Sequence, residues 1–402
     1  MRPKSEFDLL VESGLFHLVA ERAEGREFRV EGNPVVDFCQ TNYLGLDFHP
    51  RFLEEAGKTF RAWGSLTPTS RMEIDPVIFP KIEERIANLL GAEQVHLGST
   101  ITQLGFSLIP GIVEKGTIFA DSKLHTVVYE ACRLARDHGA RIVRFEHQNL
   151  RDLEQRLKEC KEPGPKLIAV DGVYSISTEM SDLPALQRLC EEFDAFLYVD
   201  DAHGFGIFGE APSVEHPWGT GGGGVVRHLG TGYTRTFYAS SFGKAFCTQG
   251  AFITIPSGFK RDVKTFSMHY LFSAPLPPVQ VGFLNAVLDL NESIGEDLRS
   301  GLFEKTRRFV QNLQSLDIDC INERFHPVVY VPVGRIEDLL RVGALFKEAG
   351  IMPGLRSHPV VPPDQCGFRF AVSSLHTREQ LDRAIGVFRE HRREFRTARP
   401  RS

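Results

Sequence analysis

The chain has 402 residues, of which 42% are hydrophobic and 25% charged, as in ordinary soluble globular proteins. Because a single hydrophobic core rarely exceeds about 250–300 residues, this length predicts a large domain and a smaller one. The net charge of −5 gives no reason to expect nucleic-acid binding, and no apolar run approaches the roughly 18 residues that cross a bilayer.

The first part of the chain predicts short strands and then a helix. Residues 25–40, GREFRVEGNPVVDFCQ, alternate in the manner of a β-hairpin. Residues 80–91, PKIEERIANLLG, have apolar side chains at helical spacing, and Gly91 is a natural C-cap.

Short apolar runs and a helical pattern alternate through the middle of the chain. Residues 166–172 (KLIAVDG), 195–201 (AFLYVDD) and 250–256 (GAFITIP) are apolar and bounded by turns or charges. Residues 182–194 form an amphipathic helical pattern between the first two runs. This alternation predicts an α/β fold with parallel strands and crossover helices.

The pattern changes from about residue 290 to longer charged helices that alternate with strands such as HPVVYVPV and GFRFAVSS. We therefore expect three parts: an N-terminal segment at residues 1–45, a large domain at 46–289, and an α+β domain at 290–402.

A glycine-rich stretch, HPWGTGGGGVVRHLGTG, interrupts the large domain. Four consecutive glycines, at positions 221–224, cannot hold a fixed backbone without outside support. The stretch predicts a mobile surface loop, with a lid over an active site as the alternative.

Lys244 and Asp200 carry the strongest chemical signal. Lys244 lies in SSFGKAF between small residues, so a bulky planar partner can approach its amine. Asp200 follows five apolar residues and is delivered to the carboxyl end of a strand, where ligands bind in open α/β sheets. A lysine for a Schiff base, and a carboxylate that keeps a pyridine nitrogen protonated, are what pyridoxal phosphate requires.

Other residues near these motifs fit the same cofactor. His203 follows Asp200 by three positions and can bond the ring's phenolic oxygen, while Ser241 precedes the lysine by three and can reach a phosphate. Ser99 lies where a predicted strand meets a helix, and free N–H groups there make a phosphate seat. His125 lies near the start of another predicted helix, where a structural histidine is equally compatible with the sequence.

Arg369 lies within an apolar strand pattern, GFRFAVSS. A buried guanidinium must find an anion, because leaving it unpaired is costly. The anion is either a carboxylate of the protein or the carboxylate of a substrate, which arginine binds in bidentate fashion.

Taken together, these motifs resemble those of the α-oxoamine synthase family of fold-type-I pyridoxal-phosphate enzymes. The resemblance covers roughly residues 30–390 and rests on eight motifs in the family's order: TNYLGLDFHP, GSTITQ, DSKLH, DGVYS, VDDAHGFGIFGE, SSFGKAF, YLFSAPLPP and FRFAVSSLHT. It implies a large domain with a mostly parallel seven-stranded sheet between helices, a smaller C-terminal α+β domain, and a homodimer.

The resemblance also implies a role for each matched residue. Lys244 would bind the cofactor and move protons at the substrate α-carbon, Asp200 would pair with the ring nitrogen, and His203 would contact the ring oxygen. By the same resemblance, His125 would stack on the ring and Ser175 would support it. The phosphate would be bound by Ser99, Thr100, Ser241 and the partner subunit's Ser273. The substrate would be bound by Arg369, Thr41 and Asn42.

Some positions depart from the family pattern. Cys247 replaces a glycine, Thr100 replaces an aromatic residue of the phosphate loop, and Gln103 stands where asparagine is common. These changes leave the cofactor chemistry intact and concern the choice of substrates.

The resemblance implies a decarboxylative Claisen-type condensation. A small amino acid and an acyl thioester, carried by coenzyme A or a carrier protein, would give an α-amino ketone, carbon dioxide and free thiol. The alternatives are an aminotransferase, a non-catalytic partner subunit of a serine palmitoyltransferase-like complex, and a nucleotide-binding Rossmann protein, although GFGIFGE lacks the required glycine spacing.

Cysteine and histidine usage adds two expectations. Seven scattered cysteines without a CxxC motif suit a reducing cytoplasm. The 14 histidines form no HxH or HExxH pair, so we expect no metal site.

Overall fold

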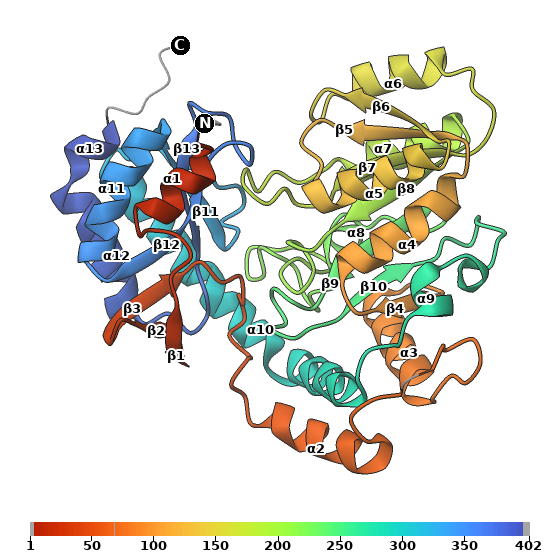
Figure 1. Cartoon of the computed structure of the whole chain (residues 1–402), viewed down its shortest axis with the longest axis horizontal. Coiled ribbons are helices and arrows are strands. Elements are labelled where there is room, and N and C mark those ends of the chain that lie inside the picture. The colour runs from red at the N-terminus through yellow and green to blue at the C-terminus, as the bar shows by residue number, and fades with distance from the viewer. Residues whose placement is uncertain (1–3, 68, 397–402) are drawn as a thin grey trace. The chain divides into compact units, whose positions relative to one another are not determined.

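The computed structural model describes residues 4–67 and 69–396. The chain divides into two compact units. The first unit comprises Met1–Gly45, Ile176–Thr178 and Asp297–Ser402, and the second comprises Leu46–Ser175 and Glu179–Glu296. Each unit has its own sheet (Figure 1).

The second unit contains a seven-stranded sheet in the order β4-β10-β9-β8-β7-β5-β6. Pairs β5–β6, β5–β7, β7–β8 and β8–β9 are parallel, whereas β10 runs antiparallel to β4 and β9. The predicted α/β fold with a mostly parallel sheet is therefore confirmed. The strands are β4 Val95–Gly98, β5 Thr117–Asp121, β6 Arg141–Phe145, β7 Lys166–Asp171, β8 Ala195–Asp200, β9 Thr236–Ser241 and β10 Ala251–Thr254.

Helices pack on this sheet because parallel strands must be covered on both faces. In the core, α4 and α5 pack against each other and α4 packs on β9 and β10, with Leu104, Leu108 and Ile112 buried. The predicted helix ending at Gly91 is confirmed, since Gly91 caps α3 with a φ of 65°. The helices are α2 Arg51–Trp63, α3 Ile78–Leu90, α4 Ile101–Val113, α5 Thr126–Asp137, α6 Leu150–Glu159, α7 Leu183–Glu192, α8 Val225–His228, η1 Val263–Thr265 and α9 Met268–Phe272.

The first unit contains a six-stranded sheet in the order β1-β2-β3-β12-β13-β11. The predicted hairpin at residues 25–40 is confirmed as the antiparallel pair β2–β3. The chain enters this unit within the long helix α10, Pro278–Ser315. Its other elements are α1 Glu6–Glu12, β1 Ala20–Glu24, β2 Glu27–Val30, β3 Asn33–Phe38, β11 Val328–Gly334, α11 Ile336–Glu348, β12 Ile351–Arg356, β13 Cys366–Ala371, α12 Arg378–Glu390 and α13 Arg392–Arg396.

The glycine run at 221–224 is part of the packed interior, so the expectation of a mobile surface loop was wrong. Gly222, Gly223 and Gly224 are buried, Gly222 O accepts from Gly206 N at 2.8 Å, and Gly224 N donates to Phe208 O at 2.7 Å. Gly224 has a φ of 87°, and a Cβ there would lie 1.8 Å from the Tyr238 hydroxyl oxygen. Glycine is required because the backbone passes directly against a buried side chain, and the same contacts leave the lid alternative without support.

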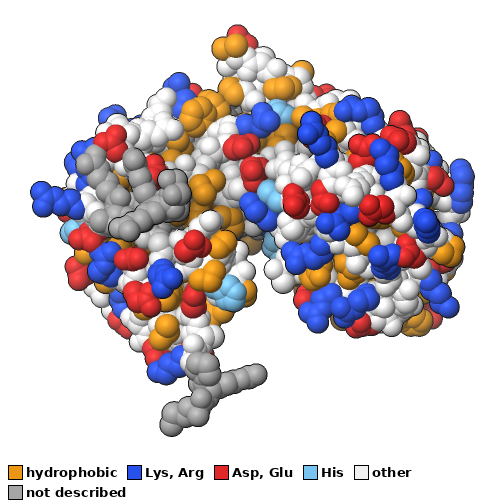
Figure 2. Space-filling view, turned by 90° about the horizontal axis from the view of Figure 1, so that it is seen from above, with side chains coloured by type: hydrophobic (Ala, Val, Ile, Leu, Met, Phe, Trp, Pro, Cys, Tyr) orange, Lys and Arg blue, Asp and Glu red, His pale blue; other side chains and the backbone are white. Residues whose placement is uncertain are grey.

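Two surface properties complete the description. Among the described residues, no helix is both long and apolar enough to cross a membrane. On the face shown in Figure 2, Lys and Arg side chains are interspersed with Asp and Glu.

Candidate active site

Two carboxylates meet at the carboxyl ends of neighbouring strands. Asp171 ends β7, Asp200 ends β8, and the two residues are partners in the parallel register. Both are almost fully buried. Burial and the charge of Asp200 raise the pKa of Asp171 well above its ordinary value. The two carboxyl groups therefore lie side by side at one buried edge of the sheet, where the charge of Asp200 disfavours ionisation of Asp171.

Lys244 lies in the turn after β9, the strand next to β8. The positive charge of Lys244 acts on Asp171 and opposes the rise of its pKa, which places the lysine beside the carboxylate pair. Ser241, at the end of β9, fixes the turn by accepting from Gly243 N at 3.0 Å and donating to Gly250 O at 3.3 Å. Cys247, the residue that replaces a family glycine, has a φ of 57°, so it adopts the conformation that usually favours glycine.

His203 lies in the turn that follows Asp200. The carboxylate of Asp200 accepts from Ala202 N at 3.1 Å, and His203 is buried. Asp201 anchors the same turn by accepting from Gly204 N at 3.1 Å, Val225 N at 3.0 Å and the Tyr238 hydroxyl at 2.7 Å. Burial raises the pKa of Asp201 to about 7, although these hydrogen bonds oppose the rise.

His125 begins α5, as the sequence predicts. The imidazole Nδ1 of His125 accepts from Val127 N, and the backbone N–H of His125 donates to Asp171 Oδ1 at 3.1 Å. Asp171 therefore connects the start of α5 to the strand end next to Asp200. Ser175 follows β7 in the turn beside Tyr174 and is half-buried.

The predicted phosphate seat lies at the start of α4. Ser99 and Thr100 follow β4, and the Thr100 hydroxyl caps the helix by accepting from Gln103 N at 3.1 Å. Gln103 Nε2 donates to Ser273 Oγ at 3.4 Å. Ser273 therefore lies beside the seat of its own chain, and its reach toward the partner subunit's phosphate stays a prediction.

The residues of the second unit fit pyridoxal phosphate. A helix start with a hydroxyl suits a phosphate, an ionised buried carboxylate suits a pyridinium nitrogen, and the lysine amine suits an aldehyde carbon. Asp200 is almost fully buried at a strand end, so a cation placed against its carboxylate would relieve the cost of its burial. The structure brings together Asp200, Asp171, Lys244 and His125, with Ser241, His203 and Ser175 on adjoining turns.

The predicted substrate residues belong to the first unit. Arg369 extends from β13, and its Nε is buried without a hydrogen-bond partner among the described residues. Arg356 ends β12, the neighbouring strand, and burial together with the charge of Arg369 lowers its pKa to about 10. Two buried guanidinium groups that repel each other make a site for an anion.

Asn42 and Thr41 both have hydrogen-bond partners within the protein. The Asn42 side-chain oxygen accepts from Arg26, which also forms a buried ion pair with Asp37 at 2.5 Å. The carbonyl of Thr41 accepts from Tyr43 N at 2.9 Å. The polar group of Asn42 is thus engaged within the protein, and substrate binding by these two residues stays a prediction.

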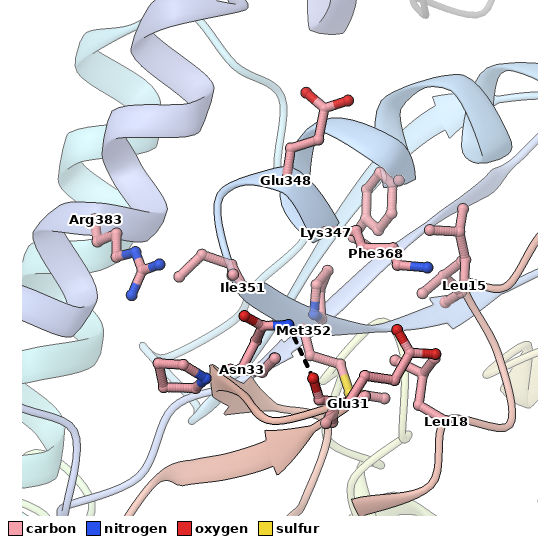
Figure 3. Close-up of a pocket in the computed structure, with 17 residues that line it drawn as sticks. Leu15, Leu18, Glu31, Asn33, Lys347, Glu348, Ile351, Met352, Phe368 and Arg383 are labelled. Atoms are coloured by element: carbon pink, nitrogen blue, oxygen red, sulfur yellow. Dashed lines mark hydrogen bonds between the residues drawn. The ribbon is translucent and has the colours of Figure 1, made fainter.

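A separate cavity of about 340 Å³ lies within the first unit (Figure 3). None of the predicted site residues lines it. Leu355 and Phe368, which pair between β12 and β13, contribute to its wall. Because side chains alternate along a strand, their neighbours Arg356 and Arg369 point to the other face of the sheet.

Two contributors were missed from the sequence: Asp171 and Arg356. Asp171 follows the apolar run KLIAV as Asp200 follows AFLYV, so the same pattern identifies it. Arg356 ends β12 in a stretch that looks like an ordinary charged turn, and only the folded arrangement places it beside Arg369.

Comparisons with known proteins agree with this geometry. The profile of "Aminotransferase class I and II" matches residues 33–388. The 8-amino-7-oxononanoate synthase of Stutzerimonas stutzeri is 30% identical over 370 residues, covering 91% of this chain and 90% of that protein. That of Geobacter sulfurreducens is 29% identical over 388 residues, covering 95% of each. Serine palmitoyltransferase from S. paucimobilis, solved with a bound PLP–myriocin aldimine, has a TM-score of 0.85 at 22% identity and covers 97% of this chain and 96% of its own.

Proposed function

The chain belongs to the aminotransferase class I and II family, and from this premise we propose that it is a pyridoxal-phosphate-dependent α-oxoamine synthase. It condenses a small amino acid with an acyl thioester to give an α-amino ketone, carbon dioxide and free thiol. The observation that carries the proposal is the pair of buried carboxyl groups, Asp171 and Asp200, at neighbouring strand ends beside Lys244. Relatives named 8-amino-7-oxononanoate synthase support the reaction class.

Pyridoxal phosphate, when bound, supplies an electron sink for the substrate α-carbon. Asp200 keeps the pyridine nitrogen protonated, because an adjacent carboxylate favours the cation. Burial beside Asp200 raises the pKa of Asp171, and the Asp171 carboxyl oxygen accepts from His125 N and so holds the start of α5. Electrostatic pairing of this kind is strong where water is excluded.

Lys244 has two tasks in this proposal. Its amine would hold the cofactor, and the same amine would move a proton at the substrate α-carbon. Ser241 supports both tasks, because its hydroxyl bonds fix the turn that carries the lysine. Ser99, Thr100 and Ser241 bind the phosphate group, and His203 contacts the ring oxygen.

Arg369 binds the carboxylate of the amino acid. A guanidinium forms two parallel hydrogen bonds with a carboxylate, which fixes the orientation of the bond to be broken. Arg356 contributes a second cation from the neighbouring strand. An anion between them relieves their mutual repulsion.

We also propose a cytoplasmic homodimer. Large apolar side chains are exposed on α2 and the segment after it, including Leu53 at 78% and Ile74 at 67%, and a second copy of the chain would cover them. Cysteines are free throughout the described residues, which suits a reducing compartment. In this proposal residues 46–289 form the cofactor domain and residues 290–402 the smaller domain.

The test begins with the cofactor spectrum of the purified protein in the presence of single amino acids. We expect one small amino acid to shift the spectrum, and carbon dioxide to be released only when an acyl thioester of coenzyme A or a carrier protein is added. Borohydride should fix the cofactor to Lys244, and K244A should lose both the absorbance and turnover. Conversion of an amino acid with a keto acid and no thioester would show an aminotransferase instead.

A further inference from the structure

Two turns at the carboxyl edge of the seven-stranded sheet carry residues of the candidate active site. One turn follows β5 and leads to His125, and the other follows β7 and carries Ser175. In Figure 1, β5, β6 and β7 belong to the same end of this sheet. His147 lies two residues after β6 and contacts a carboxylate of each turn, although the proposed reaction gives it no role.

The imidazole of His147 lies between two carboxylates. Its Nδ1 is 2.9 Å from Asp121 Oδ1, and its Nε2 is 2.9 Å from Glu179 Oε2. The ring also packs edge-on against Tyr174, with ring centroids 4.5 Å apart. Both nitrogens face acceptors, so the ring donates to both only when it is an imidazolium.

Asp121 organises the turn that leads to His125. Its buried carboxylate accepts from Lys123 N at 2.7 Å and from Gln148 N at 2.9 Å, and its carbonyl accepts from Leu124 N at 3.1 Å. Two of these bonds depend on the orientation of the Asp121 carboxylate, so its contact with His147 helps to fix the turn.

Glu179 belongs to the turn that carries Ser175. Tyr174 N donates to Glu179 O at 3.0 Å, and Val173 pairs with Met180 in an antiparallel bridge. The side chain of Glu179 holds His147, while its backbone closes the turn around Ser175. One ring therefore links two turns that are far apart in the sequence.

We propose that His147 is a positioning residue that, as an imidazolium between Asp121 and Glu179, holds the turns of His125 and Ser175 in one arrangement around the cofactor. The inference rests on the proposed function, since it concerns residues that contact pyridoxal phosphate. It assigns His147 no contact with the cofactor or the substrate.

The charges around His147 give this role a pH dependence. Burial lowers the pKa of His147, but the hydrogen bonds to Asp121 and Glu179 outweigh it and the net pKa is raised. Lys123 acts in the opposite direction to the two carboxylates, and Tyr174 and Asp171 lie on the neighbouring strand end. The imidazolium persists above the ordinary pKa of 6.5, and the link weakens as pH rises through the raised value.

The experiment reconstitutes apoprotein with pyridoxal phosphate and measures its dissociation constant by absorbance between pH 6.5 and 9. Three proteins are compared: wild type, H147Q, and H138Q as a matched control, because His138 is an exposed histidine at the end of α5. We expect H147Q to bind about tenfold more weakly at pH 6.5, because displaced contact residues lose orientation. The ratio of the dissociation constant of H147Q to that of wild type should shrink as pH rises, and H138Q should match wild type at each pH.

Hydrogen exchange of the apoprotein provides a readout that does not require the cofactor. H147Q should exchange faster at residues 122–128 and 173–180 than wild type, with strand β8 unchanged. The double variant H147Q/E179Q replaces the charged contact with two amides that can hydrogen-bond, and it should recover part of the affinity. If H147Q does not fold, E179Q alone should show the same faster exchange.

The outcomes separate this inference from the proposed function. If borohydride fixes the cofactor to Lys244 in wild type, but H147Q and E179Q match wild type in affinity, pH dependence and exchange, the positioning role is refuted alone. If wild type holds no cofactor at Lys244, the proposed function fails, and the inference fails with it.

Discussion

Asp201 allows a quantitative test of how burial sets charge at the sheet edge. Its carboxyl is fully buried, and its pKa rises from 3.8 to about 7. The folded protein therefore binds this proton more tightly than the unfolded chain, which stabilises the fold fully below about pH 3.8. That contribution is lost as pH rises toward 7.

The magnitude follows from the shift. At 1.36 kcal/mol per pKa unit, a shift of about three units corresponds to about 4 kcal/mol. Most of the loss occurs between pH 4 and pH 7, so about 2.5 kcal/mol should disappear between pH 5 and pH 8. D201N removes the titrating group, and its amide replaces one of the two acceptor oxygens at a cost of roughly 1–3 kcal/mol that does not depend on pH.

The assay is urea unfolding of the apoprotein at pH 5, 6, 7 and 8. We expect the free energy of unfolding of D201N, relative to wild type, to rise by about 2.5 kcal/mol from pH 5 to pH 8. D137N is the matched control, because Asp137 is exposed on α5, and its curve should run parallel to that of wild type. A parallel curve for D201N would show that this carboxyl is ionised throughout and would refute the reasoning.

Three further predictions concern the same arrangement. D171N should retain turnover within about threefold in steady-state assays, because its amide oxygen can accept the hydrogen bond from His125 N and burial beside Asp200 already raises the pKa of Asp171. A severe loss of turnover would show that the reaction needs the charged form of Asp171. R356Q should raise the KM for the amino acid by roughly tenfold with a smaller change in kcat, since it removes one cation from a site for a carboxylate. An unchanged KM would show that Arg356 does not contribute to that site. G224A should destabilise the protein by roughly 3 kcal/mol or more in thermal unfolding, because the added Cβ would lie 1.8 Å from the Tyr238 hydroxyl oxygen in a residue with a φ of 87°. G232A is the control and should have little effect, because nothing lies within 4 Å of a Cβ at that position.

The sequence predicts what depends on local pattern. An apolar run followed by an acid identifies the end of β8, and helical spacing followed by Gly91 identifies the end of α3. The start of α5 at His125 and the hairpin β2–β3 follow from equally local signals. These features are predictable because strand and helix periodicity and capping act within a few residues.

The features that sequence reasoning missed depend on contacts between distant segments. The glycine run was taken for a loop because glycine alone indicates freedom, whereas here Tyr238 and Phe208 hold the backbone from other elements. The contact between Arg26 and Asn42, 16 residues apart, likewise could not be read from the local sequence. His147 reads as a surface residue until the fold places it between two carboxylates.

The sheet edge shows why residue type alone could not assign these roles. Asp121 and Asp171 each end a strand, and Asp201 follows one. All three aspartates are buried, yet their pKa values shift in different directions. Burial raises the pKa of each, but for Asp121 the hydrogen bonds from His147, Gln148 and Lys123 outweigh burial and lower it, so Asp121 is an ionised anchor. Asp171 stands beside the charge of Asp200, and its pKa rises.

These differences in pKa limit the negative charge at the carboxyl edge of the seven-stranded sheet. Asp121 is paired with His147, and burial beside Asp200 raises the pKa of Asp171, so in the proposed function Asp200 is the carboxylate that would pair with the ring nitrogen of the cofactor. If Asp171 were ionised as well, two adjacent buried carboxylates would repel each other and bind a second proton or cation in place of a single pyridinium. The specificity for one cation therefore follows from the partners that each aspartate acquires on folding.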